Sequence, residues 1–158
     1  MSVKRVAFAA TVVKDQFIYA FDGDETGSIE RYDIAKDSWQ IMDFKLNSPN
    51  HNFSCFCPEP DKVVLLGGRD EWLNKVEMID LKTKKWETLP EMNDNREYLH
   101  NQVVFIDGYA YVPAGESGVK TEKFDYKEKR WIPLPNQPIE DVMCAWSCAL
   151  TYIPQEIK

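Results

Sequence analysis

The segment Lys75-Val-Glu-Met-Ile-Asp-Leu-Lys-Thr-Lys-Lys-Trp86 decides the fold, because its pattern occurs twice more in the chain. The other copies are Ser28-Ile-Glu-Arg-Tyr-Asp-Ile-Ala-Lys-Asp-Ser-Trp39 and Lys120-Thr-Glu-Lys-Phe-Asp-Tyr-Lys-Glu-Lys-Arg-Trp131. Their aspartates follow one another at steps of 47 and 45 residues. Similarity that returns at such a period indicates a repeat architecture, so we interpret the chain as three copies of one structural unit.

The three units share one order of residue types. A glutamate is followed by a large apolar residue, an aspartate and a tryptophan, and a β-rich run that ends in glycine precedes the glutamate. A further strand candidate precedes that run, so each unit is predicted to form four short strands. The repeated positions are Gly23, Gly67, Gly68 and Gly115; Glu30, Glu77 and Glu122; Tyr32, Ile79 and Phe124; Asp33, Asp80 and Asp125; and Trp39, Trp86 and Trp131.

Each repeated residue type has a physical reason to stand where it does. A glycine at the end of the second strand permits a tight bend or a close approach that a side chain would block. The aspartate can accept hydrogen bonds from backbone N–H groups of the turn that follows it. The tryptophan then begins the far strand of a hairpin and fills the space between neighbouring sheets. One such sheet cannot bury its own face, so the units are expected to stack.

Composition restricts the class of protein. The 158 residues suit one domain of ordinary globular composition, with 44% hydrophobic and 13% aromatic residues. A net charge of -7 argues against nucleic-acid binding, which requires surplus lysine and arginine. No apolar stretch is long enough for a membrane-spanning helix, so no membrane partner is expected. Lys4 and Arg5 precede the apolar run 6–13, but small residues interrupt that run, which favours a strand over a cleaved signal peptide.

The four cysteines are arranged as Cys55-x-Cys57 and Cys144-x-x-x-Cys148. Neither pair has the Cys-x-x-Cys spacing typical of structural zinc. We therefore interpret them as small buried thiols of a cytoplasmic protein, and expect no metal.

The pattern of glycines, an apolar residue before aspartate, and tryptophan six residues later resembles the kelch repeat of β-propellers. The middle unit is most similar, with Leu66-Gly67-Gly68, Asp80, Trp86 and Leu89-Pro90, whereas the first has Asp22-Gly23 and the third Ala114-Gly115 at the glycine position. Arg96-x-x-x-His100 also resembles the family's usual lead-in to an innermost strand. The resemblance covers about residues 6 to 152.

The resemblance implies an all-β fold of kelch-type propeller blades, each a four-stranded antiparallel sheet. The expected boundaries are 6–46, 47–92 and 93–138 for three blades, and 139–158 for an additional innermost strand with a C-terminal tail. That gives thirteen strands, fewer than a closed ring requires. By analogy the chain looks like the C-terminal half of a six-bladed ring, and we expect either self-association or a complementary half-propeller to close it.

In kelch-like propellers the loop between the second and third strands and the loop between blades emerge on one face. The candidate partner-binding residues on that face are Asp24, Glu25, Arg69, Asp70, Glu71, Trp72, Asn95, Arg96, Tyr98 and Glu116. Trp72 occupies no repeated position, and beside Arg69 it is either an interface anchor or a cover over its own blade. The acidic residues form either a solvated rim or a site, and a site of this charge would favour a basic segment.

Enzymatic readings find little support in the sequence. His51 and His100 precede Asn52 and Asn101 at comparable places, and a repeated position argues for a structural task. Asp22-Gly-Asp-Glu-Thr-Gly27 lacks the ligand spacing of a calcium loop and is expected to be a surface turn. No catalytic residue and no cofactor is assigned.

The resemblance implies a cytoplasmic protein–protein interaction module that acts as a substrate adaptor or a cytoskeletal scaffold. The alternative is a small enzyme or a carbohydrate-binding propeller with its site near the central channel.

Overall fold

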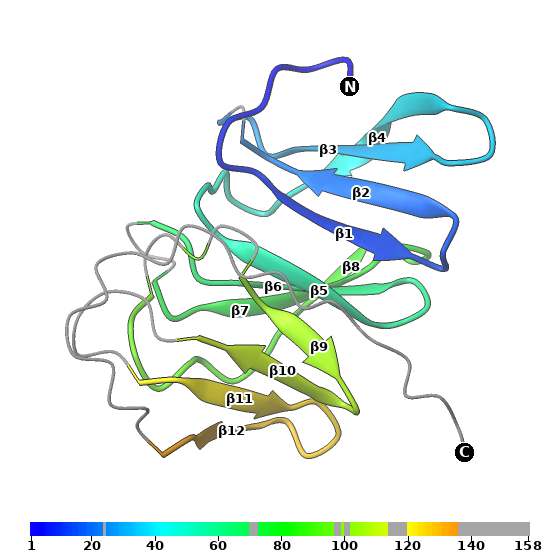
Figure 1. The fold of residues 1–158 in the computed structure, drawn as a ribbon. Coiled ribbons are helices and arrows are strands. Elements are labelled where there is room, and N and C mark those ends of the chain that lie inside the picture. Colours follow the sequence, from blue (N-terminus) through cyan, green and yellow to red (C-terminus); the bar gives the residue numbers. More distant parts are fainter. Residues whose placement is uncertain (24, 70–72, 97–98, 100–101, 114–119, 136–158) are drawn as a thin grey trace, which may run out of the picture.

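The structure is a computed structural model that describes residues 1–23, 25–69, 73–96, 99, 102–113 and 120–135. These residues form twelve strands in three four-stranded antiparallel sheets, each with its strands in sequence order (Figure 1). The strands are β1 (Ala9–Val13), β2 (Phe17–Phe21), β3 (Ser28–Asp33) and β4 (Ser38–Lys45) in the first sheet; β5 (Ser54–Glu59), β6 (Lys62–Leu66), β7 (Val76–Asp80) and β8 (Lys85–Thr88) in the second; and β9 (Val104–Ile106), β10 (Tyr109–Val112), β11 (Glu122–Asp125) and β12 (Arg130–Pro133) in the third.

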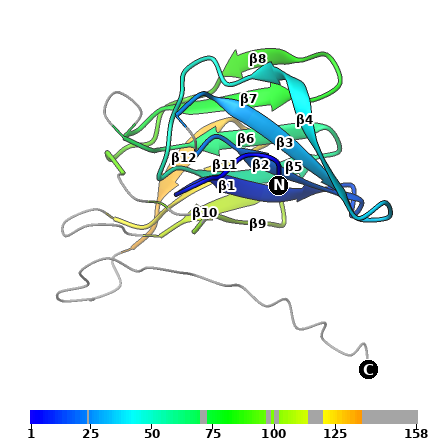
Figure 2. The ribbon, with the colours of Figure 1, turned by 90° about the horizontal axis from the view of Figure 1, so that it is seen from above.

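The sheets lie side by side, with β5 beside β1 and beside β9 (Figures 1 and 2). The all-β fold of four-stranded blades predicted from the sequence is therefore confirmed. The residue boundaries of the blades stay predictions, and the additional strand expected within 139–158 lies outside the described residues.

Two apolar clusters join the three blades. Alternation along each strand sends one set of side chains to each face of its sheet, so the middle blade contributes to both clusters. The cluster between the first and middle blades contains Ala9, Val13, Tyr19, Phe21, Ile29, Phe53, Cys55, Val63, Leu65, Ile79 and Leu81. The cluster between the middle and third blades contains Phe56, Val64, Leu66, Val76, Met78, Leu89, Met92, Leu99, Ala110, Val112 and Phe124. Strand β6 is accordingly buried on both faces.

The repeated tryptophans stand opposite the repeated apolar residues. Trp86 pairs with Ile79 across strands β7 and β8, and Trp131 pairs with Phe124 across β11 and β12. Trp86 packs against the cluster shared with the first blade, and Trp131 against the cluster shared with the middle blade. Each of these indoles therefore fills the space toward the preceding blade, as the sequence predicts.

The repeated aspartates hold the hairpins that end in those tryptophans. Asp80 Oδ1 accepts hydrogen bonds from the backbone N–H groups of Lys82 at 2.9 Å and Thr83 at 2.8 Å. Asp33 and Asp125 accept equivalent bonds from turn residues at 3.1 and 3.0 Å. The predicted role of the aspartate in the turn is confirmed in all three blades.

In the part of the chain that the structure describes, no helix is long and apolar enough to cross a membrane.

Candidate functional site

The loops between second and third strands meet the loops between blades at one end of the sheets. Asp22, directly after β2, is fully buried and its Oδ2 accepts a hydrogen bond from the backbone N–H of Asn50 in the next inter-blade loop. Its Oδ1 accepts another from the Gly27 N–H at 3.2 Å. Asp22 thus joins two of the described loops at this end of the molecule, and these loops form one surface.

Asn50 is a second centre of this surface. Its Nδ2 donates to the Gly67 carbonyl at 3.1 Å, and its Oδ1 accepts from the backbone N–H groups of His51 at 2.8 Å and Arg69 at 3.3 Å. The Arg69 Nη1 then lies 2.8 Å from His51 Nε2, and since arginine can only donate, that imidazole nitrogen accepts. The exposed guanidinium of Arg69 is therefore oriented by the loop that carries Asn50.

Each of the outer two blades contains a buried arginine–glutamate pair at this end. In the first blade, Arg5 Nε lies 2.9 Å from Glu30 Oε2, and both side chains are fully buried. The guanidinium also donates to the Asp22 carbonyl and, at 3.0 Å, to the Ser28 carbonyl. Burial alone would raise the pKa of Glu30, but the Ser2 N–H and Arg5 outweigh burial and lower that pKa.

The third blade repeats the arrangement with Arg96 and Glu122. Arg96 Nη2 lies 3.1 Å from Glu122 Oε1, and the guanidinium donates to the carbonyls of Pro113, at 2.7 Å, and Lys120. Asn93 Nδ2 donates to the other carboxylate oxygen at 2.6 Å. Burial lowers the pKa of Arg96, and Glu122 opposes that shift.

The burial of Arg96 corrects one prediction. Arg96 was expected to contact a partner, but only 1% of the residue is exposed and its guanidinium is fully used within its own blade. A pair removed from water in this way is expensive to break, so Arg96 is a structural residue.

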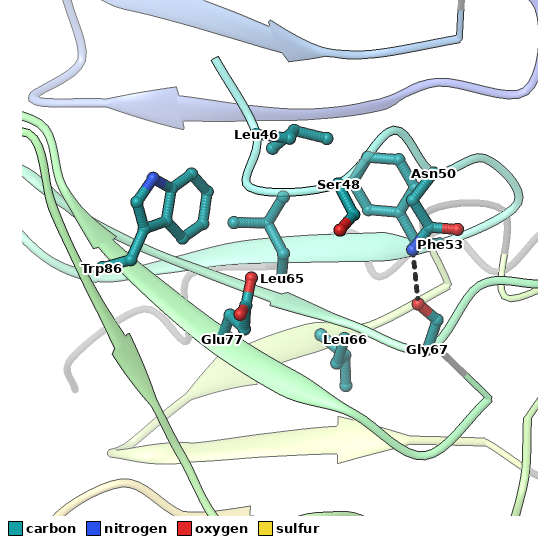
Figure 3. A pocket seen from close by; sticks show the side chains of 9 residues that line it. All are labelled: Leu46, Ser48, Asn50, Phe53, Leu65, Leu66, Gly67, Glu77 and Trp86. Carbon is teal, nitrogen blue, oxygen red and sulfur yellow. Dashed lines mark hydrogen bonds between the residues drawn. The ribbon is translucent and has the colours of Figure 1, made fainter. Parts of the chain in front are cut away.

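The middle blade has a pocket at the corresponding place. Its empty volume of about 250 Å³ includes open solvent, and the enclosed part has room for about one water molecule. Figure 3 shows the carboxylate of Glu77 extending from β7 between Trp86 on one side and Ser48 and Asn50 on the other. Burial raises the pKa of Glu77, and a hydrogen bond from the Asn47 side chain and the charge of Lys75 oppose that rise. The complete lining is Leu46, Ser48, Asn50, Phe53, Leu65, Leu66, Gly67, Glu77 and Trp86.

The predicted partner-binding residues divide into three groups. Glu25, Arg69 and Asn95 are exposed at the loop end of the sheets. Arg96 is buried, as described above. The remaining predicted residues lie outside the described residues: Asp24, Asp70, Glu71, Trp72, Tyr98 and Glu116. The repeat position Gly115 and the histidine His100 lie outside them as well.

Sequence reasoning missed Arg5, Asp22 and Asn50 as organising residues. Arg5 precedes an apolar run, and its immediate neighbours suggest only the start of a signal peptide. The usable signal was the recurrence of an arginine ahead of the first strand together with a glutamate three residues before the repeat aspartate, seen in the first and third units.

The described residues offer little for metal or thiol chemistry. Within the ranges that the structure describes, no three histidine, cysteine, aspartate or glutamate side chains lie together as a metal site. Cys55 and Cys57 are free, and burial raises the pKa of both thiols, which favours the uncharged form. The chemistry of the surface is that of carboxylates, amides and one oriented guanidinium, which suits recognition.

Four-stranded antiparallel sheets that stand side by side on their first strands, with tryptophans packed toward the preceding sheet, define blades of a β-propeller. Comparison with known proteins gives the type of the middle blade: residues 60–93 match the family model described as the Kelch motif. The blades on either side of it have the same four-stranded fold.

Relatives of the chain also carry kelch repeats. The kelch repeat-containing protein kel-10 of Caenorhabditis elegans is 28% identical over 120 residues, which is 69% of this chain and 21% of that protein. The kelch repeat protein C2 of Camelpox virus (strain CMS) is 26% identical over 133 residues, which is 78% of this chain and 24% of that protein. The chain therefore spans about a fifth to a quarter of these relatives.

A solved structure has a similar fold. The structure of YjhT superimposes with a TM-score of 0.69 at 15% sequence identity, and the match covers 88% of this chain and 54% of that one. At this identity the likeness concerns the fold alone.

Proposed function

We propose that the chain is a protein-interaction module that binds a partner protein through the end of its blades where the inter-blade loops lie. The observation that carries the proposal is the surface built by Asp22 and Asn50, which joins loops from separate blades and orients the exposed guanidinium of Arg69. Kelch repeats in the relatives support the same general role.

The partner segment is proposed to be basic. The chain carries a net charge of -7, and Glu25 is exposed at the proposed surface, so charge complementarity favours a lysine- and arginine-rich segment. Action as a substrate adaptor or as a cytoskeletal scaffold is consistent with such binding, and the identity of the bound partner decides between them.

Selection from a displayed library of random short peptides tests the proposal. We expect enrichment of basic peptides, and loss of their binding in the variant Glu25→Lys/Trp72→Ala, with circular dichroism showing an unchanged fold. Glu128→Lys is the matched control, because it makes the same change in charge and Glu128 is exposed in the hairpin between β11 and β12, at the other end of the sheets. The proposal is wrong if no peptide is enriched, or if binding survives the loop variant and is lost in the control.

A further inference from the structure

The arginine–glutamate pairs of the outer blades occupy one repeated position. Glu30 and Glu122 each stand three residues before the repeat aspartate, and both arginines also donate to the carbonyl two residues before their glutamate, at Ser28 and Lys120. Each guanidinium also donates a hydrogen bond to a carbonyl just beyond the end of the second strand of its blade. Each outer blade thus supplies a carboxylate and two carbonyls that together hold one guanidinium.

The middle blade has the same acceptors without the arginine. Cys55 pairs with Leu65, and Leu65 pairs with Glu77, as Ala10 pairs with Ala20 and Ala20 with Glu30. Counting five residues back from Ala10 gives Arg5, and counting five back from Cys55 gives Asn50. The middle blade therefore carries an asparagine at the chain position of Arg5. Arg96 stands four residues before His100, and the residue four before His51 is Asn47, so the middle blade has asparagine where either arginine stands.

The shorter side chain satisfies only part of the site. Asn50 donates to the Gly67 carbonyl at the end of the second strand, which is one of the acceptors that an arginine would use. Glu77 receives a hydrogen bond from Asn47 and the field of Lys75, in place of a guanidinium. The space that a longer side chain would fill is the pocket in Figure 3.

The pocket's chemistry suits an arginine supplied from outside. Glu77 offers a carboxylate that can accept two parallel N–H bonds. Trp86 forms one wall, and an indole face attracts a guanidinium, which stacks on it more readily than an ammonium does. Burial raises the pKa of Glu77 because it disfavours the charged carboxylate, and a bound cation would stabilise that charge.

We propose that the pocket at Glu77 binds an arginine side chain of a protein partner, in the place that Arg5 and Arg96 hold in the other two blades. The inference rests on the proposed function, because the arginine has to come from a bound partner protein. It adds to that function the chemical group that the module recognises. The pocket lies between the first and middle blades, because Leu46 follows β4 and the other lining residues belong to the middle blade or its lead-in loop.

The direct test uses N-acetyl-arginine methylamide as the probe and the Trp86 indole N–H resonance as the readout, assigned with Trp86→Phe. We expect a saturable shift of that resonance. N-acetyl-citrulline methylamide, which has the same shape without the charge, is expected to leave it unmoved. The inference is overturned if the arginine probe causes no shift, or if the citrulline probe causes an equal one.

Two chain variants localise the binding. Glu77→Gln is expected to weaken probe affinity about tenfold or more, because it removes a charge-assisted interaction. Glu128→Gln, on an exposed turn, makes the same change in charge and is expected to leave affinity unchanged. Equal affinities of all three proteins would contradict the assignment to Glu77.

Asn47→Arg provides an independent check, because Asn47 stands four residues before His51 as Arg96 stands four before His100, and its exposed side chain already contacts Glu77. This variant is expected to abolish probe binding, since its own guanidinium would pair with Glu77. Intact probe binding in a folded Asn47→Arg variant would overturn the inference. Failure of the peptide selection with a positive probe result would count against the proposed function alone, and selected peptides whose binding ignores Glu77→Gln would count against this inference alone.

Discussion

Glu30, Glu77 and Glu122 stand at one repeated sequence position and lie in different electrostatic surroundings. The first and third are paired with buried arginines, whereas the second has the weaker support of Asn47 and Lys75. The pKa of Glu30 is lowered and that of Glu77 is raised. Equivalent positions in a repeat protein can therefore have opposite effects on stability.

Matched substitutions measure that difference. Glu122→Gln is expected to lower the free energy of unfolding by about 3–5 kcal/mol, because it leaves Arg96 as a buried charge without its counter-ion. Glu77→Gln is expected to raise it slightly, on the order of 0.5 kcal/mol at pH 7. The sign follows from the raised pKa of Glu77, since the stability contribution of such a carboxyl is lost as pH rises through its folded-state pKa. Urea unfolding checks both, and equal losses in the two variants would contradict the account.

Gly68 has no room for a side chain. A Cβ atom there would overlap the Asn50 amide, and the φ of Gly68, +136°, is one that other residues rarely adopt. Gly108 also has a positive φ, +81°, but its Cβ would meet nothing within 4 Å. Gly108→Ala thus isolates backbone strain, which costs about 1–2 kcal/mol.

Gly68→Ala is expected to cost about 1–3 kcal/mol beyond that, because it forces Asn50 to move. Thermal unfolding of the two variants provides the measurement. If Gly68→Ala loses no more thermal stability than Gly108→Ala, Asn50 moves aside without a cost in free energy.

At the scale of elements, the hairpin between β7 and β8 depends on the charge of Asp80. The Thr83 N–H and Lys62 lower the pKa of Asp80 from 3.8 to about 2. A lowered pKa means that the charged form stabilises the folded state above the unfolded-state pKa and that this contribution is lost as pH falls. We expect wild type to exceed Asp80→Asn in stability above about pH 5, with the difference disappearing as pH falls from about 4 to about 2.

Denaturant unfolding of both proteins across this pH range is the measurement. Asp15→Asn serves as control, because Asp15 is exposed in the turn between β1 and β2. A stability difference between wild type and Asp80→Asn that persists at pH 2 would contradict the assignment.

The elements were predictable because their residues recur. Aspartate, tryptophan and the opposing apolar residue act within one hairpin, so their spacing is visible along the sequence. The pairs of Arg5 with Glu30 and Arg96 with Glu122 join residues 25 and 26 positions apart, and nothing local indicates which arginine folds inward. The sequence alone therefore predicts Arg96 to be a partner-binding residue.

At the scale of the whole molecule, none of the described blades covers the face of the first blade that points away from the middle blade. Val12, Ile18, Tyr32 and Trp39 are successive cross-strand partners, and they alternate with the residues that face the middle blade. Val12 is 49% exposed, and Ile41, two residues after Trp39, is 51% exposed. In the next two blades the corresponding face is covered by the preceding blade.

We expect this apolar face to drive self-association of the isolated chain. The mass measured by light scattering on a sizing column should rise with protein concentration, and Val12→Lys/Ile41→Lys should restore the mass of one chain. Lys36→Glu, away from this face, controls for a general effect of changed charge. A wild-type chain that stays at one-chain mass at every concentration would count against self-association, and the covering partner would then be a different surface.

The hydrogen bond from Trp131 Nε1 to the Pro90 carbonyl, at 2.8 Å, crosses from the third blade to the tail of the middle one. The segment that can be transplanted as a working blade is therefore longer than its own strands: it has to bring Pro90 as an acceptor and Arg96 as a counter-ion, both well ahead of β9. A third blade transferred from its first strand onward would lack the acceptor of the Trp131 indole N–H and the counter-ion of Glu122. Recombination that exchanges blades between propellers would thus succeed most often when its breakpoints fall before the tail of the preceding unit.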